Sequence, residues 1–342
     1  MQVFEVLSPG LLTTVQDRGR YGYQAFGMPV AGAMDDYAFR AANILVGNDP
    51  NTAALEITLL GPRLRVLAPT VLAIAGADLG ACLNEMELPL WQSVAVQAGD
   101  EISFSGPRSG CRAYLAVAGG IDVPVVMGSC STYLRGETGG FGGRALAAGD
   151  VLSAGEATPS ARALVGRRPP PELIPSYSCE IDLRVIMGPQ DEYFTEAGKE
   201  TFLSSTYTIT NESDRMGCRL AGPKIEHVQG PDILSDGIPL GAVQVPGHGF
   251  PIILLADRQT VGGYTKIATV IGADICRIGQ AKPGDRVRFH ATTRTEAVEL
   301  LREHEERLKR LAAFIHQDIG RMWGYFIKVK GEHFEVTVQE LK

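Results

Sequence analysis

The 342-residue chain is predicted to be mainly β, with two β-barrel domains, a few short helices, and a C-terminal helix followed by a β-hairpin. Three observations support this class. Its 40 glycines and 20 prolines indicate many turns and few long helices. Apolar residues alternate with polar or small ones in several short segments, which is typical of half-buried strands. Apolar runs at 71–75, 114–118 and 252–256 indicate strands buried on both faces.

The alternating segments are short and recur through the chain. They contain Leu64 and Val66, Val94 and Val96, Ile102 and Phe104, Tyr207 and Ile209, and Val287 and Phe289. Gly-Asp pairs end at Asp100, Asp150 and Asp285, each just before a predicted strand. We predict a tight turn at each pair, because glycine accepts a positive φ and the carboxylate can bond to nearby backbone.

Three helices are predicted. The first runs from about Met34 to Val46 and stops at Gly47. The second begins near Pro189 and places acidic residues against its dipole. The third begins at Thr293, which has capping-box spacing to Glu296. Its apolar stripe contains Val298, Leu301, Leu308, Leu311, Ala312 and Ile315.

We predict a first barrel at 1–165, a linker at 166–180, a second barrel at 181–290 and an extension at 291–342. The linker contains two arginines and three consecutive prolines, which stiffen the backbone and remove donors. The two barrels begin alike, and two further segment pairs are similar between them. This pattern indicates a degenerate duplication in which two similar barrels face each other. The pairs are FEVLSPG at 4–10 with LRVIMGP at 183–189, LGPRL at 60–64 with AGPKI at 221–225, and two Asp-Arg loops.

Composition excludes several classes of protein. The net charge of −7 argues against non-specific nucleic-acid binding. The six cysteines show no C-x-x-C spacing, and no His or Cys cluster has the spacing of metal ligands. The N-terminal residues have neither a basic region nor a long apolar stretch, and no apolar run later in the chain reaches membrane-spanning length. We therefore expect a soluble cytoplasmic protein with free thiols and neither a metal site nor a membrane or nucleic-acid partner.

The two Asp-Arg loops are the clearest candidates for a functional site. Residues 16–23 read QDRGRYGY and residues 257–264 read DRQTVGGY. Charged groups beside permissive glycines suit a backbone that approaches a polar ligand closely. Either pair alone is more often a local ion pair that fixes a turn. Their recurrence favours a site, or two half-sites.

Other polar loops are weaker candidates. Residues 213–217 (SDRMG) and 234–238 (LSDGI) contain ordinary turn residues, yet their hydroxyl, carboxylate and guanidinium groups also suit a planar amide ligand. Residues 128–132 (GSCST) add donors. No phosphate-binding Gly-x-x-x-x-Gly-Lys motif occurs, and the glycines at 136–143 lack the spacing of a dinucleotide fingerprint.

Six motifs occur together in one order. They are TVQDRGRYGY at 14–23, GAMD at 32–35, AVAGGI at 116–121, SDRMG at 213–217, ILSDGI at 233–238 and ADRQTVGGYTK at 256–266. In this combination the chain closely resembles the biotin-dependent carboxyltransferase-like family, which includes allophanate hydrolase subunit 2 and the C subunit of bacterial 5-oxoprolinase. The resemblance extends from about Val3 to about His290. One departure is Cys130, where the family pattern has arginine, so anion binding at that position is in doubt.

The resemblance implies two cyclophilin-like β-barrel domains that work with a B subunit of related fold and, in the 5-oxoprolinase system, with an A subunit. That system opens 5-oxo-L-proline to L-glutamate at the expense of ATP. We therefore expect the C subunit of such an ATP-dependent lactam hydrolase, inactive without its partners, with ATP at a composite site between subunits. One alternative is a carboxyltransferase component that works with a separate biotinyl carrier. Another is a regulatory protein that binds a kinase-inhibitor-like B partner.

The substrates of this family share a planar N–H beside a C=O. As a hypothesis, Arg18 and Arg258 donate to the carbonyl oxygen, and Asp17 or Asp257 receives the N–H. Further substrate contacts are expected from other side chains in the same motifs. Gln16, Gln259 and Tyr264 would orient the substrate, Lys266 would neutralise an anion, and Ser213, Asp214, Arg215, Ser235 and Asp236 would complete the pocket.

The tail is a predicted hairpin, since residues 325–341 alternate and can turn at Lys330-Gly331. It resembles the opening hairpin of a biotinyl carrier domain but lacks the Ala/Val-Met-Lys-Met motif that accepts biotin. The favoured alternative is a hairpin that packs on Trp323 and the preceding helix, because an isolated hairpin needs a neighbour to be stable.

Overall fold

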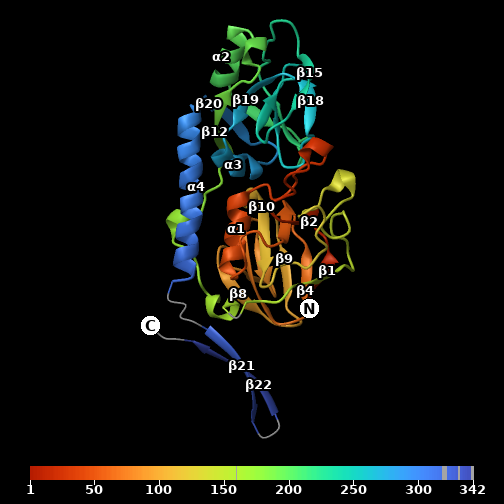
Figure 1. The fold of residues 1–342 in the computed structure, drawn as a ribbon, viewed down its shortest axis with the longest axis vertical. Coiled ribbons are helices and arrows are strands. Elements are labelled where there is room, and N and C mark those ends of the chain that lie inside the picture. Colours follow the sequence, from red (N-terminus) through yellow and green to blue (C-terminus); the bar gives the residue numbers. More distant parts are fainter. Residues whose placement is uncertain (159, 318–321, 330–331, 340–342) are drawn as a thin grey trace.

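The structure is a computed structural model that describes residues 1–158, 160–317, 322–329 and 332–339, the last two ranges as backbone strands. Two β units are stacked along the long axis, and helix α4 (Arg294–Ile315) runs beside both (Figure 1). The predicted mainly β fold with few helices is confirmed. Within the described ranges, no helix combines the length and apolar character needed to cross a membrane.

In the first unit, two antiparallel sheets enclose one apolar core. Phe4, Leu55 and Leu115 are fully buried between them. The first sheet contains, in order, β11 (Val151–Ser153), β1 (Gln2–Ser8), β4 (Arg63–Val66), β9 (Glu101–Phe104), β6 (Ala81–Leu83) and β7 (Met86–Glu87). The second contains β2 (Leu12–Gln16), β3 (Ala54–Thr58), β10 (Ser109–Val117), β5 (Thr70–Asp78) and β8 (Ser93–Val96). Helix α1 (Asp36–Leu45) covers the outer face of β5 and β10, which explains their long apolar runs.

The second unit is a closed seven-strand barrel. Its strands follow the order β12 (Glu180–Met187), β19 (Lys266–Val270), β16 (Ala242–Gln244), β17 (Ile252–Leu254), β14 (Gly217–Ala221), β13 (Tyr207–Ile209) and β20 (Arg286–Ala291). β12 and β20 pair in parallel and close the barrel. Phe202 of α2 (Glu196–Ser204) stacks on Phe289 and seals one end of the core. A separate two-stranded ribbon consists of β15 (Asp232–Gly237) and β18 (Val261–Tyr264).

Short elements complete the described chain. Helix α3 (Ile275–Gly279) follows β19. The 3-10 turns are η1 (Gln24–Phe26), η2 (Leu134–Gly136), η3 (Ala161–Leu164), η4 (Pro171–Leu173), η5 (Asp191–Tyr193) and η6 (Gly272–Asp274). The C-terminal strands β21 (Met322–Val329) and β22 (Glu332–Gln339) pair antiparallel, which confirms a two-stranded hairpin. The predicted turn at Lys330-Gly331 and the side-chain packing of Trp323 lie outside the described residues.

The three predicted Gly-Asp turns are confirmed. Gly99, Gly149 and Gly284 have φ values of 94°, 88° and 92°. Each following aspartate accepts a hydrogen bond from the backbone N–H three residues before it, at 2.7, 2.7 and 3.0 Å. These turns could be predicted because all of their determinants lie within four consecutive residues.

The helices differ from the predictions in detail. The first begins after Asp35, whose carboxylate caps the N–H of Ala38 at 3.0 Å. The prediction of a helix from Pro189 is wrong: the acidic residues form η5, and α2 begins only after Thr195, whose hydroxyl caps Gly198 at 2.9 Å. In α4 the cap at Thr293 is confirmed.

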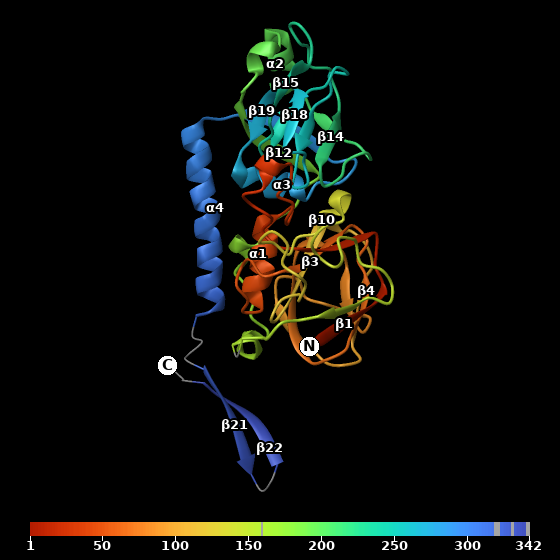
Figure 2. The same cartoon turned by 45° about the vertical axis from the view of Figure 1, so that its right-hand side comes forward.

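The C-terminal half of helix α4 packs on the first unit. Leu308, Leu311 and Ile315 are buried with α1, whereas Val298 and Leu301 are 40% and 45% exposed. The guanidinium of Arg40 on α1 forms two hydrogen bonds to Glu305, at 2.8 and 2.9 Å. The helix stands beside both units in either view, although it follows the second unit in sequence (Figure 2). The boundaries drawn at 165, 180 and 290 stay predictions.

Candidate functional site

The loop after β2 carries the first Asp-Arg motif to the interface where residues of the first unit contact residues of the second. This interface is called the seam. The backbone of Ala33 returns to Asp17 at 2.9 Å, and the N–H of Ala31 donates to the carbonyl of Ala256 at 3.1 Å. Ala256 directly precedes the second Asp-Arg motif. The fold therefore brings together segments that carry the two motifs, although Asp17 and Asp257 are 240 positions apart in the sequence.

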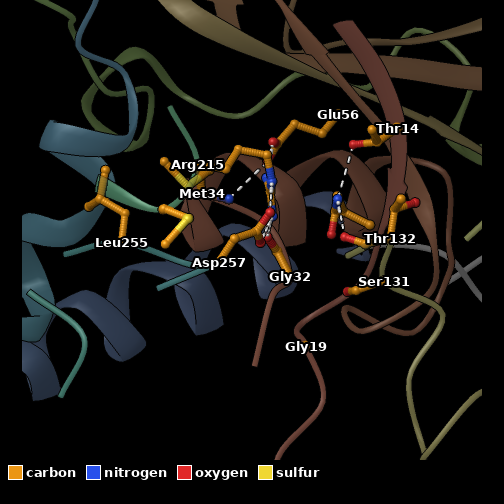
Figure 3. Close-up of polar contacts among 12 residues, drawn as sticks. Thr14, Gly19, Gly32, Met34, Glu56, Ser131, Thr132, Arg215, Leu255 and Asp257 are labelled. Carbon is orange, nitrogen blue, oxygen red and sulfur yellow. Dashed lines mark hydrogen bonds and ion pairs between the residues drawn. The ribbon is translucent and has the colours of Figure 1, made fainter. Parts of the chain in front are cut away.

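An arginine from the second unit is buried at this seam. Arg215 is 5% exposed and pairs with both oxygens of Asp257, at 2.9 and 3.1 Å (Figure 3). It also donates to Glu56 of the first unit and, at 2.6 Å, to the carbonyl of Gly32. Burial raises the pKa of Asp257, and Arg215 opposes this shift. Burial acts to lower the pKa of Arg215, but Asp257 and Glu56 outweigh it and raise that pKa overall.

This ion cluster continues into a larger buried network. The second oxygen of Glu56 accepts from the Met34 N–H and the Tyr114 hydroxyl, both at 2.8 Å. Farther along the seam, Gln280 of the second unit donates to Asp35 at 2.8 Å and accepts from the N–H of Arg112 at 2.9 Å. We infer that these groups hold the two units in a fixed relation, because buried charges need partners on both sides.

The carboxylate of Asp17 is occupied within its own unit. One oxygen accepts from the hydroxyl of Ser129 at 2.7 Å, from Ser131 and from the Gly19 N–H at 2.8 Å. The other accepts from the Cys130 N–H at 2.6 Å. Asp17 therefore anchors the 128–132 loop, and burial raises the pKa of the half-buried Cys130 thiol.

The neighbours of Asp17 have different environments. Gln16 is fully buried and donates to the Thr14 hydroxyl at 3.0 Å and the Thr132 carbonyl at 3.2 Å. Arg18 is exposed and pairs with Asp36 at 3.1 Å. Arg20 is fully buried and donates to the carbonyls of Val126 and Ser131, at 3.0 and 2.9 Å.

Arg258 lines a cavity of about 270 Å³ at the seam. It is 8% exposed and donates to the main-chain carbonyls of Ile238 and Leu255, at 3.0 and 3.2 Å. Burial lowers its pKa, and the phenol of Tyr21 acts weakly in the other direction. Among the described ion pairs, none involves Arg258, so a buried cation faces this cavity without a carboxylate. The cavity wall also includes Gln24, Pro29, Val30, Gly237, Pro239, Gln259 and Thr260.

The remaining predicted residues lie in the second unit. Asp214 accepts from the N–H groups of Met216 and Gly217, at 2.8 and 3.1 Å, and Ser213 accepts from the Arg219 N–H at 3.0 Å. Both are therefore turn residues in this structure. The ammonium of the buried Lys266 reaches Asp236 on the ribbon at 3.2 Å and lowers its pKa.

The ribbon carries two further predicted residues. Ser235 and Tyr264 are exposed on it. The structure thus forms two groups, one at the Arg215 cluster and one around Arg258 and the ribbon. In the ranges where side chains are described, no cluster of His, Cys, Asp or Glu has the geometry of a metal site.

Sequence reasoning missed Glu56, Arg112, Gln280 and Arg20. Glu56 carried a usable signal, because it is a single carboxylate within the apolar strand Ala54–Thr58. Such a carboxylate requires a partner when the strand is buried. Its partner could not be identified from the sequence, because Arg215 is 159 positions away.

Comparisons with known proteins agree on one family. Residues 26–291 match the model of the carboxyltransferase domain, subdomain A and B. The chain is 36% identical over 323 residues to the C subunit of the Escherichia coli K12 5-oxoprolinase, covering 92% of this chain and 100% of that protein. It is 37% identical over 305 residues to the urea amidolyase of Lachancea kluyveri, covering 84% of this chain and 17% of that protein.

Solved structures give the same result. The chain superposes on the Kluyveromyces lactis urea carboxylase with a TM-score of 0.85 at 34% identity, over 90% of this chain and 29% of that one. It spans only 20% of the K. lactis urea amidolyase, with the same TM-score of 0.85. Since the family model covers most of the chain and a relative matches along its full length, the chain belongs to the family of the carboxyltransferase domain, subdomains A and B.

Proposed function

We propose that this chain is the C subunit of an ATP-dependent 5-oxoprolinase and that, with A and B partner subunits, it hydrolyses 5-oxo-L-proline to L-glutamate. One observation carries the proposal. The match to the E. coli 5-oxoprolinase component extends over 100% of that protein, whereas the L. kluyveri urea amidolyase is matched over only 17% of its length. This match along the full length of the E. coli component supports the assignment to a 5-oxoprolinase C subunit.

The Arg258 cavity is the proposed substrate site. In the reaction, water adds to the lactam carbon and the ring C–N bond breaks, which frees the amine and a second carboxylate. Negative charge develops on the lactam oxygen before that bond breaks. Arg258, which forms no ion pair with a described carboxylate, would donate to this oxygen, and the adjacent Gln259 would orient the N–H. A buried, preorganised donor stabilises such charge more strongly than one in water.

Asp17 and Asp257 receive positioning roles in this proposal. Both oxygens of each carboxylate already accept hydrogen bonds or ion-pair contacts from inside the chain, which supports a role in orienting neighbouring groups. Asp17 holds the 128–132 loop, and Asp257 holds the side chain of Arg215. Arg18, Lys266, Tyr264, Ser235 and Asp236 stay predicted contacts at the edge of this surface.

The cavity residues do not fit ATP. Arg258 is the only charged residue of the described wall, and a triphosphate with its metal needs several cations or a cradle of backbone N–H groups. No step that uses ATP is therefore assigned to this cavity. A nucleotide held by a partner subunit at the mouth of this cavity would supply the phosphoryl group that activates the lactam oxygen.

A second candidate function is carboxyl transfer with a separate biotinyl carrier. The superposition on the K. lactis urea carboxylase favours it. The biotin ureido ring presents the same neutral N–H and C=O fragment, which one buried donor fits. The third possibility, a regulatory protein that only sequesters a B-type partner, would need binding without turnover.

A three-way comparison separates these functions. The chain is mixed with its A and B partners and ATP, and then supplied either with 5-oxo-L-proline or with urea and a carrier that bears carboxybiotin. The proposal predicts glutamate from the first substrate and no carboxylated urea from the second. Carboxyl transfer without glutamate would replace the proposal with the second function. Tight binding to the B partner without either product would replace it with the regulatory one.

A further inference from the structure

A second and larger cavity lies on the α4 side of the seam. Its volume is about 560 Å³, and its walls come from α4, the 174–178 segment and α3. It shares no lining residue with the Arg258 cavity. Helix α4, which supplies one wall, lies beyond the 26–291 range that the family model matches. This cavity is thus separate from the proposed substrate site.

Most charged groups in this cavity already have partners within the chain, although those of Asp35 are neutral donors. Arg184 forms two bonds with Asp274, at 2.6 and 2.9 Å. Glu180 pairs with Arg286. Asp35 accepts from the Ala38 N–H, Gln280 and Tyr177, which occupies both of its oxygens. Burial lowers the pKa of the neighbouring His304.

Three charged side chains of the cavity wall remain available to a ligand. Arg277 on α3 is 57% exposed. Among the described carboxylates it pairs only with Asp274, at 3.5 Å, which also pairs with Arg184. Arg307 lies over the ring of Tyr37 at 5.0 Å. In the portion of the chain described with side chains, neither Arg307 nor Glu303 takes part in an ion pair. The cavity therefore offers two guanidinium groups and one carboxylate.

We propose that this cavity binds an acidic amino acid with a free α-ammonium group. Two carboxylates would bind Arg277 and Arg307, and the ammonium group would bind Glu303, which complements the three unbalanced charges. L-Glutamate has this set of charges. So does a γ-glutamyl dipeptide such as γ-glutamylglycine, which fills more of a 560 Å³ cavity.

The position of the groups gives the site a regulatory consequence. Arg277 belongs to the second unit, whereas Glu303 and Arg307 lie on α4, which packs on α1 of the first unit. A ligand held by all three would tie α4 to the second unit beside the seam network. The choice of L-glutamate as first probe rests on the proposed function, because it is the product of that reaction. The charge balance itself does not depend on that function.

Calorimetric titration of the purified full-length chain, without partner subunits, tests the site. We expect saturable binding of L-glutamate or γ-glutamylglycine with a dissociation constant of about 1 mM or below. N-Acetyl-L-glutamate lacks the ammonium group and L-glutamine lacks one carboxylate, so each should bind about tenfold more weakly. The stronger of L-glutamate and γ-glutamylglycine identifies the ligand.

Variants make the test specific to the cavity. R277Q and R307Q should each weaken binding about tenfold, whereas R302Q, an exposed arginine of α4 outside the cavity wall, should not change it. Arg277 is more than half exposed, so its replacement should leave the thermal melting curve unchanged. Absence of saturable heat with both ligands would overturn the proposal, as would binding that R277Q and R307Q leave intact. Because the assay involves no turnover, its failure would leave the proposed hydrolase function standing.

Discussion

The guanidinium of Arg215, in the second unit, donates to the carboxylate of Glu56 in the first. The same group also donates to Asp257 and to the carbonyl of Gly32. Glu56 is 1% exposed and Arg215 5% exposed, so the contact lies inside the protein. One cation therefore serves two carboxylates that belong to different units. Its removal leaves Glu56 with only Arg112, 3.9 Å away, and leaves Asp257 with no ion pair among the described side chains.

Replacing Arg215 should destabilise the whole chain. We expect R215M to lower the free energy of unfolding by about 3–5 kcal/mol, the usual cost of leaving a buried partner charge uncompensated. Urea denaturation measures this loss. R219Q, on the exposed side of β14, should change stability by less than about 0.5 kcal/mol. Equal effects of R215M and R219Q would mean that the cluster of Arg215, Glu56 and Asp257 adds no more to stability than an exposed arginine does.

Asp17 should behave as a positioning residue. In D17N the amide nitrogen cannot accept the N–H of Cys130, so we expect a loss of about 1–3 kcal/mol of stability. Faster hydrogen exchange at residues 128–132 should accompany it, because this loop loses its anchor. If D17N abolished turnover while stability and exchange stayed at wild-type values, Asp17 would contact the substrate directly.

Arg258 should matter for turnover more than for folding. R258Q removes a buried cation that pairs with no carboxylate in the part of the chain described with side chains, so the melting temperature should change little. Loss of one donor to a developing oxyanion typically costs about 10²–10³ in kcat, and we expect a decrease in that range in the assembled enzyme. R219Q again serves as control. A wild-type kcat for R258Q would exclude the assigned role.

The carboxyl group of Asp35 should make stability depend on pH. Burial raises its pKa from 3.8 to about 6, so between these values the folded state holds a proton that the unfolded state has lost. Its contribution to stability is therefore greatest below pH 4 and declines as the pH rises through 6. A shift of about two units corresponds to about 3 kcal/mol.

Comparison with D35N isolates this group from the other carboxylates. The difference in unfolding free energy between wild type and D35N should fall by about 3 kcal/mol from pH 4 to pH 7. Urea titrations at four pH values measure it. A difference that stayed constant, or that rose with pH, would contradict the raised pKa.

Features determined by neighbouring residues were predictable from the sequence. The Gly-Asp turns and the cap at Thr293 each depend on residues within four positions of one another. The prediction placed the start of α2 too early. The residue that caps the helix is Thr195, whose hydroxyl accepts the N–H of Gly198, and not one of the acidic residues near Pro189.

Features that depend on distant residues were not predictable. The sequence identified Arg215, Asp257 and Arg258 as candidates. It could not show that Arg215 pairs with Glu56, whereas Arg258 pairs with none of the described carboxylates. That difference arises only when the two units meet. The cavity beneath α4 likewise depends on where a helix encoded after the second unit packs on the first.

The most direct test of the proposed function measures glutamate released from 5-oxo-L-proline by the A and B partners with ATP, first without this chain and then with it restored. We predict no glutamate above background in its absence, turnover when the wild-type chain is added, and a large loss of that turnover with R258Q. Glutamate release that is equal with and without the chain would contradict the assignment of this protein as a required component of the hydrolase.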